Sequence, residues 1–230
     1  FARERHWPAG LGPQQPVARP AVPAPLHPLI GTAVPSLKGA CFTLRLSTEN
    51  PILDGHRVDG TPLLQNIAIP EIIRAALEIT QVSNVTGVSN VAWLAPIPAG
   101  TEATLLITEA SNGMSFEISS GAKKLVSGLV NQSPENRQKI RVDTETLGAP
   151  LTGSEIYARM ALLGVDYRGT FRGLKTLQAN AQQAMADIVA PVAAPGLAWS
   201  PVLLDIAAQA MMGLLGASGE ASPFVPFLAD

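Results

Sequence analysis

The chain has 230 residues and a formal net charge of −2, and only 15% of its residues are charged. Its mean hydropathy of +0.22 indicates a globular protein with a sizeable core, either one large domain or two small ones. The near-neutral charge argues against a nucleic-acid or anionic-membrane partner. A single cysteine, Cys41, excludes a disulfide framework, and three histidines leave little material for a metal centre.

The first 26 residues predict an extended linker. Residues 1–35 contain eight of the 20 prolines, and proline at this density favours a polyproline-II path without hydrogen-bonded structure. The chain starts with Phe1 rather than Met and shows no signal peptide, which favours a piece of a longer protein. No apolar run reaches the roughly 18–20 residues that span a bilayer.

The first half of the chain predicts a helix among strands. Alternation over 42–47 predicts a half-buried strand that Asn50 and Pro51 interrupt, followed by a glycine-rich loop over 53–60. Apolar spacing predicts a helix over 69–80. In the strand-rich stretch of about 90–145, Asn112-Gly113 separates strand patterns at 104–108 and 114–118, which predicts a hairpin.

The second half predicts another helix among strands. Residues 144–154 have the character of a connection, and a short helix over 154–163 and a strand-like segment over 171–190 are expected to follow. Ser200 has the character of an N-cap and Pro201 that of a first helical residue. The run 202–215 contains only two polar residues, Asp205 and Gln209, and therefore predicts a helix buried on all sides.

Asp205 is the acidic residue that the pattern singles out. Gln209 follows one helical turn later on the same, otherwise apolar face. A buried carboxyl without a cationic partner stays protonated, and a raised pKa suits a general acid. The alternative is a first-turn acidic residue that the helix dipole favours, although Asp205 stands about five positions beyond the expected cap.

His56 is the histidine best placed for proton transfer. It stands between Gly55 and Gly60 in the predicted loop between a strand and a helix. The alternative is an ordinary histidine of a surface loop. His27, which precedes a proline, is expected to be structural or solvated, and Cys41 to be a small buried side chain.

Several segments of the sequence resemble the motifs of a known protein family. The opening of the chain from residue 27, with His56 and Gly60 at the spacing HxxxG, resembles the dehydratase domains of modular type I polyketide synthases. Further blocks are similar to the family's GYxYGPxF and LLDxxxQ motifs and to the linker that precedes such domains; they lie at residues 164–171, 203–209 and 1–7. The resemblance spans essentially the whole chain.

The resemblance implies an α+β fold of the double-hotdog type, in which two antiparallel sheets each wrap around a central helix. The expected division is a linker over 1–26, an N-terminal hotdog over 27–145, a connection over 146–154 and a C-terminal hotdog over 155–230 that ends early for the family. It also implies a cytoplasmic enzyme of polyketide and antibiotic biosynthesis that forms homodimers.

The implied reaction is loss of water from a β-hydroxyacyl thioester, which gives an α,β-unsaturated thioester. His56 would act as general base, Asp205 as general acid and Gln209 as the residue that orients Asp205. Gly60, with a backbone N–H near the thioester carbonyl, and Tyr167 and Phe171 would bind substrate. The substrate would arrive in a tunnel on the phosphopantetheine arm of an acyl carrier protein, without a cofactor or a metal.

Two positions depart from the family pattern. Gln65 replaces the proline of the first motif, and Arg168 interrupts the Tyr-Gly-Pro segment. Both are expected at wall or loop positions. They keep open a double-bond-shifting isomerase or an oxygen-ring-forming cyclase, and a non-catalytic dimerisation module is a third alternative. Besides neighbouring synthase domains, a carrier protein is the expected partner, and Arg168 and Arg172 are candidates for its docking face.

Overall fold

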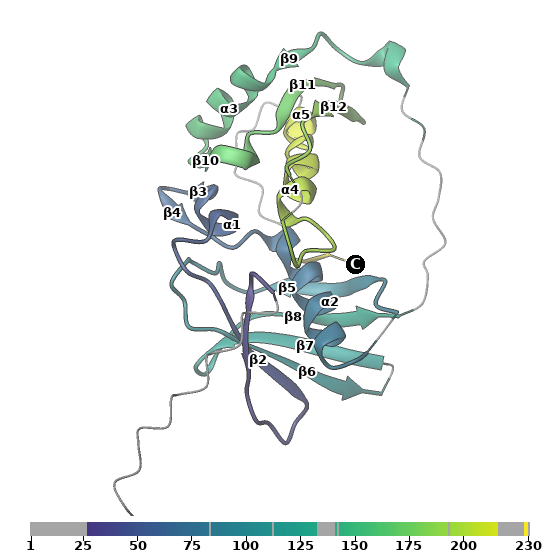
Figure 1. The fold of residues 1–230 in the computed structure, drawn as a ribbon. Helices are drawn as coiled ribbons and strands as arrows, with labels where there is room; N and C mark the ends of the chain where they lie inside the picture. Colours follow the sequence, from purple (N-terminus) through teal and green to yellow (C-terminus); the bar gives the residue numbers. More distant parts are fainter. Residues whose placement is uncertain are drawn as a thin grey trace, which may run out of the picture.

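The chain forms two lobes that meet near the middle of the molecule (Figure 1). The computed structural model describes residues 27–82, 84–111, 113–132, 141, 143–192, 194–215 and 228–229. The predicted linker over 1–26 lies outside these residues. No described helix combines the length and the hydropathy that crossing a membrane would need.

The first lobe is a seven-stranded antiparallel sheet that curves around one helix, α2 (Ile69–Ile79). In spatial order its strands are β1 (Ile30–Ala33), β2 (Ala40–Leu44), β6 (Thr104–Ala110), β7 (Gly113–Ser120), β8 (Lys123–Asn131), β5 (Gly87–Trp93) and β13 (Leu228–Ala229). The helix predicted over 69–80 is confirmed, and a short 3-10 turn, η1 (Asn66–Ala68), leads into it. The two strands β5 and β13 pair although they are far apart in sequence.

Apolar periodicity explains the core of this lobe. Seven of the eleven residues of α2 are buried, and the inward-facing residues of the sheet alternate with outward-facing ones. The fully buried side chains at this contact include Ile72, Ile73, Leu105 and Ile118. The predicted hairpin is confirmed as β6 and β7, with Ala110 opposite Gly113 at φ 124°; Asn112 lies outside the described residues.

The second lobe combines a three-stranded sheet with three helices. The sheet has the order β12 (Ala184–Ile188), β11 (Leu174–Ala179) and β9 (Leu151–Thr152). The helix predicted over 154–163 is confirmed as α3 (Gly153–Leu162), which begins with a capping box between Thr152 and Glu155. The predicted connection contains the 3-10 turn η2 (Thr144–Thr146), β9 and the start of α3.

The segment over 171–190, predicted as strand-like, is a hairpin that follows a 3-10 turn, η3 (Gly169–Phe171). Strands β11 and β12 are joined by a turn in which the N–H of Asn180 donates to the carbonyl of Gln183 over 2.9 Å. The Asn180 side chain also accepts from backbone N–H groups of this turn. Asn180 therefore stabilises a turn that apolar alternation alone did not mark.

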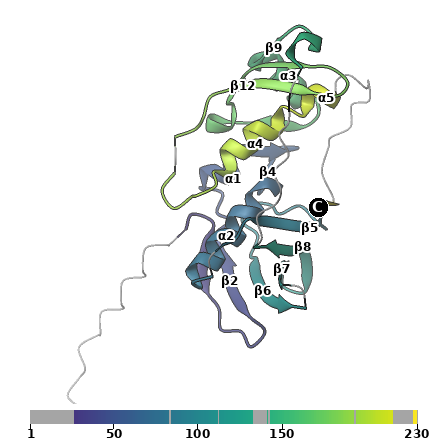
Figure 2. The same cartoon turned by 90° about the vertical axis from the view of Figure 1, so that its right-hand side faces the viewer.

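The prediction of the last helix is confirmed for its start and is wrong for its length and its burial. Ser200 caps α4 (Pro201–Gln209), and its side chain accepts from the N–H of Leu203 over 3.2 Å. The chain then breaks before α5 (Met212–Leu215). Leu204 is 37% exposed and Ala207 is also exposed, so α4 has one buried and one exposed face rather than burial on all sides. Figure 2 shows α4 and α5 as consecutive segments of the second lobe.

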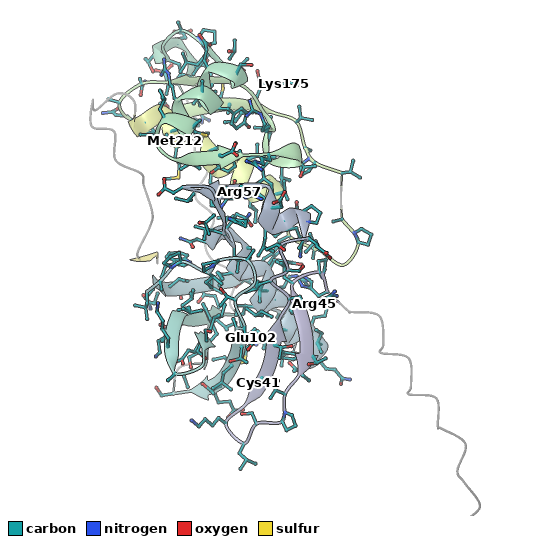
Figure 3. All side chains as sticks on the ribbon, turned by 90° about the vertical axis from the view of Figure 1, so that its left-hand side faces the viewer. Cys41, Arg45, Arg57, Glu102, Lys175 and Met212 are labelled. Carbon is teal, nitrogen blue, oxygen red and sulfur yellow. The ribbon has the colours of Figure 1, made fainter. Side chains whose placement is uncertain are left out.

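A small third sheet joins the two lobes. Its order is β10 (Val165–Tyr167), β3 (His56–Val58) and β4 (Thr61–Pro62), so one strand of the second lobe pairs with a hairpin of the first. Figure 3 shows Arg57 of β3 at this junction. The guanidinium of Arg57 donates to the carboxylate of Asp54 and to the carbonyl of Gly60, which holds the hairpin in shape.

Candidate active site

His56 lies in the junction sheet and not in a loop as the sequence predicted. A short helix, α1 (Pro51–Asp54), forms first, because the Asn50 side chain caps it by accepting from the N–H of Ile52. Strand β3 then begins at His56, and Tyr167 of β10 stands opposite His56 in the register. The imidazole and phenol rings lie 5.3 Å apart between centroids.

A close backbone approach sets the position of this strand. Gly55, at the end of α1, lies against Phe171, and a Cβ atom at residue 55 would come within 2.2 Å of the Phe171 ring. The carbonyl of Gly55 accepts from the N–H of Arg168 over 2.8 Å. His56 is therefore held by two elements of the second lobe, β10 and η3.

Asp205 and Gln209 lie on the buried face of α4, as the sequence predicted. Asp205 is 8% exposed and Gln209 is 3% exposed. The side-chain amide of Gln209 donates to Oδ2 of Asp205 over 3.0 Å and to the carbonyl of Phe171 over 3.1 Å. Tyr167 also interacts with Asp205 and lowers the pKa of its carboxyl. Since no acidic residue lies in the first turn of α4, the helix-dipole alternative does not apply.

The protonation of the two candidate residues follows from their burial. Burial lowers the pKa of His56 below its ordinary 6.5, while the charge of Asp205 and the carbonyl of Leu63 act in the opposite direction. Burial raises the pKa of Asp205 above its ordinary 3.8, against the effects of His56, Gln209 and Tyr167. The site therefore favours a neutral imidazole together with a protonated carboxyl, a base and an acid side by side.

His56 keeps one nitrogen free. Its Nδ1 is buried and has no hydrogen-bond partner among the described residues. Burial also raises the pKa of the neighbouring Tyr167 phenol, so this ring stays neutral and able to donate. A neutral histidine has one ring nitrogen that can accept a proton.

Two other residues predicted to bind substrate are Gly60, which is exposed, and Phe171, which is buried. Gly60 is exposed in the turn between β3 and β4, where its φ of 78° and the φ of 48° at Asp59 fit a two-residue hairpin turn. The Phe171 ring is fully buried, and its carbonyl is the part that reaches Gln209. Contact of Gly60 and Phe171 with substrate stays a prediction.

Gln65, at the family's proline position, is buried. It is 2% exposed, and its Nε2 donates to the carbonyl of Ile52 in α1 over 2.5 Å. Its Oε1 is buried and has no partner among the described residues. Gln65 therefore fastens the helix that precedes His56 to the start of η1.

Glu71 is a residue that the sequence did not single out, and it joins the two halves of the site. Its carboxylate is fully buried in α2 and accepts both from Arg74, at 2.7 and 2.9 Å, and from Nε2 of His27, at 3.4 Å. It also accepts from the N–H groups of Ala198 and Trp199, at 2.9 and 3.0 Å. These two residues directly precede the cap of α4, so Glu71 determines where the helix of Asp205 begins.

We expect Glu71→Gln to lower the free energy of unfolding by about 3–5 kcal/mol, the usual cost of breaking a buried charge pair. The pKa of Glu71 is lowered to about 2 from an ordinary 4.5, so its contribution is complete above 4.5 and is lost as the pH falls toward 2. Denaturant unfolding at several pH values measures it. The difference between wild type and variant should shrink below pH 4.5.

Glu78→Gln is the matched control, because Glu78 also binds Arg74 on the same helix but has a side chain that is 72% exposed. Its loss should cost at most about 1 kcal/mol. Equal effects of the two substitutions, or a Glu71 effect independent of pH, would contradict the anchoring role.

In the described part of the chain, three or more histidine, cysteine, aspartate or glutamate side chains nowhere gather closely enough to hold a metal ion. The candidate site consists of proton-transferring and hydrogen-bonding groups: His56, Tyr167, Asp205 and Gln209.

Comparison with known proteins gives the family. The family described as polyketide synthase dehydratase domain matches residues 27–121, and the one described as polyketide synthase dehydratase N-terminal domain matches residues 135–230. The chain belongs to the dehydratase domains of polyketide synthases, which are hydro-lyases that act on β-hydroxyacyl thioesters.

Curated relatives are much longer than this chain. The polyketide synthase ThaG of Burkholderia thailandensis and the spectinabilin polyketide synthase system protein NorA′ of Streptomyces orinoci are each 29% identical over 246 residues. These matches cover 97% of this chain but only 4% and 7% of the relatives. The relatives are therefore multidomain synthases, in which such a domain has neighbouring domains.

Solved structures confirm the fold. The dehydratase domain of RzxB from Pseudomonas fluorescens is 25% identical with a TM-score of 0.74, covering 86% of this chain and 78% of that chain. The dehydratase domain from the CurF module of curacin polyketide synthase is 23% identical with a TM-score of 0.68, covering 82% and 76%. The α+β double-hotdog fold expected from the sequence is thus confirmed. A CurK dehydratase in which phenylalanine replaces a histidine is described as inactive.

Proposed function

We propose that His56 and Asp205 together remove water from a β-hydroxyacyl thioester during polyketide chain extension. The observation that carries this proposal is that a base from one lobe and an acid from the other share one buried site, with opposite shifts in pKa. Gln209 would hold Asp205 in place, as its hydrogen bond over 3.0 Å supports. The inactive histidine variant of the CurK dehydratase agrees with an essential histidine in this family.

The proposed steps balance in protons and electrons. Neutral His56 takes the proton from the carbon next to the thioester carbonyl, and the electron pair of that bond forms the new double bond. The bond from the next carbon to its hydroxyl breaks, and Asp205 gives its proton to the leaving oxygen, which departs as water. His56 is then protonated and Asp205 is ionised, so one proton transfer between them restores the starting state.

Two proton-transferring groups would together give a large rate enhancement. General acid–base catalysis contributes about 10²–10⁴-fold for a positioned group. The neutral Tyr167 phenol, next to both residues, would keep the hydrogen-bonding pattern around Asp205 intact while the proton moves. An N–H donor for the thioester carbonyl would add to the rate by stabilising the charge that develops on its oxygen.

Delivery of the substrate by the phosphopantetheine arm of an acyl carrier protein is part of this proposal. Since the curated relatives are multidomain synthases, such a carrier would be a neighbour in the same assembly. Arg168 and Arg172, both exposed next to the junction, remain our candidates for its docking face. Homodimerisation and an antibiotic product belong to the same proposal.

The test is incubation of the domain with a β-hydroxyacyl thioester on an acyl carrier protein, followed by mass spectrometry of the carrier. We expect a mass loss that corresponds to one water molecule. An unchanged mass with a shifted double bond in an unsaturated substrate would favour an isomerase instead. An unchanged mass with every hydroxyacyl and unsaturated substrate offered would contradict catalysis.

A further inference from the structure

Tyr157 of α3 contacts Gln209, which in turn holds the candidate acid. It is 5% exposed, and its hydroxyl lies within hydrogen-bonding distance of three groups. The N–H of Leu174 donates to the Tyr157 oxygen over 2.9 Å, while Oε1 of Gln209 and the carbonyl of Phe171 lie at 3.0 and 3.2 Å as acceptors. Sequence reasoning did not single out this tyrosine.

Counting donors decides where the phenolic proton goes. The Leu174 N–H already uses one lone pair of the Tyr157 oxygen, so the hydroxyl must donate its single proton to an acceptor. The contact to Oε1 of Gln209, at 3.0 Å, is shorter than the contact to the Phe171 carbonyl, at 3.2 Å, and that carbonyl already receives a proton from Nε2 of Gln209. We therefore assign the tyrosine proton to Oε1 of Gln209.

This choice fixes the orientation of the Gln209 amide. With Oε1 held by Tyr157, both protons of Nε2 point the other way, one to the Phe171 carbonyl and one to Oδ2 of Asp205. Oδ2 then acts as an acceptor, so the proton of the neutral carboxyl is carried by Oδ1. A rotated amide would present an oxygen to Oδ2 and would draw the proton to the wrong side.

We propose that Tyr157 is a positioning residue that acts through Gln209 to keep the transferable proton on Oδ1 of Asp205. This inference rests on the proposed function, in which Asp205 is the acid. The connection crosses three elements, because Tyr157 lies in α3, Phe171 in η3 and Gln209 in α4. Arg172 lies over the tyrosine ring, 4.4 Å from its centroid, and restrains the ring further.

Tyr157→Phe tests this inference, because it removes the hydroxyl and keeps the ring. We expect kcat to fall by about 10–100-fold, as for one lost buried hydrogen bond in the transition state, with KM nearly unchanged. The hydrogen bond from Gln209 lowers the pKa of Asp205, so weakening it should raise that pKa. The alkaline limb of the kcat–pH profile should therefore move to higher pH.

Two controls separate positioning from simple destabilisation. Met160→Ala removes a buried side chain of the same helix, 2% exposed, that belongs to no side-chain hydrogen bond described above; it should lower the melting temperature without moving the pH profile. Gln209→Ala should make Tyr157→Phe silent, since the tyrosine acts through the glutamine. Multiplying losses in that double variant, or a wild-type pH profile in Tyr157→Phe, would overturn the inference.

A readout without catalysis distinguishes this inference from the proposed function. The carboxyl carbon of Asp205, followed by nuclear magnetic resonance as the pH changes, reports its pKa directly. A higher Asp205 pKa in Tyr157→Phe supports the positioning role even if the wild-type domain removes no water. An unchanged Asp205 pKa refutes the role even if the domain is an active dehydratase.

Discussion

Replacing His56 by alanine should lower the rate of water loss from a carrier-bound β-hydroxyacyl thioester by at least about 10²-fold, the lower range for a lost general base. The reason is structural as well as chemical. His56 brings a buried, unpaired Nδ1 to the junction sheet, directly opposite Tyr167, and nothing else in the described site can serve as a neutral base. Single-turnover kinetics with the carrier-bound substrate measure the loss.

The fold should survive this substitution. The backbone of His56 stays paired with β10, and Gly55 keeps its contact with Phe171, since neither depends on the imidazole. A melting temperature close to that of the wild type would show that the activity was lost at the site and not through unfolding. Turnover at near the wild-type rate would overturn the role of His56 as the base.

Replacing Asp205 by asparagine should lower the same rate by a similar factor of about 10²–10⁴, because an amide has no proton to give to the leaving hydroxyl. Only the charged form of Asp205 raises the pKa of His56. Because the proposed acid is already neutral before the reaction, the uncharged asparagine should leave the titration of the His56 ring, followed by nuclear magnetic resonance, close to that of the wild type.

Asp187→Asn is the matched control for this substitution. Asp187 is an exposed aspartate of β12 whose side chain accepts from Thr176 over 2.8 Å, in the same lobe but in another element. We expect wild-type turnover and an unchanged His56 titration. If Asp205→Asn left the rate at the wild-type value, Asp205 would not be the acid next to this histidine.

The identification from sequence alone depended on residues 27–31 and 51–60 and on the blocks around Tyr167 and Asp205. They predicted a dehydratase domain with a double-hotdog fold, and the family and structure comparisons confirm both. The roles of His56, Asp205 and Gln209 stay predictions, which the shared buried site supports. The division at residues 145 and 155 stays a prediction, and the described end of the chain, β13, pairs with the first sheet.

Local signals in the sequence determined the elements whose causes are local. Ser200 and Pro201 marked the start of α4, apolar spacing marked α2, and Asn112-Gly113 marked the β6–β7 hairpin, because caps, amphipathic faces and tight turns depend on residues a few positions apart. These features stabilise the same conformation in any surroundings.

Only the tertiary structure decided how these elements form a site. Glu71 reaches Ala198 across 127 positions, and Tyr157 reaches Gln209 across 52. Neither contact produces a periodic pattern in the sequence, because a single polar side chain on a helix does not indicate which distant residue it contacts. The strand position of His56 depends likewise on pairing with Tyr167 from the other half of the chain. Long-range hydrogen bonds, which local pattern cannot encode, bring His56 and Asp205 into one buried site.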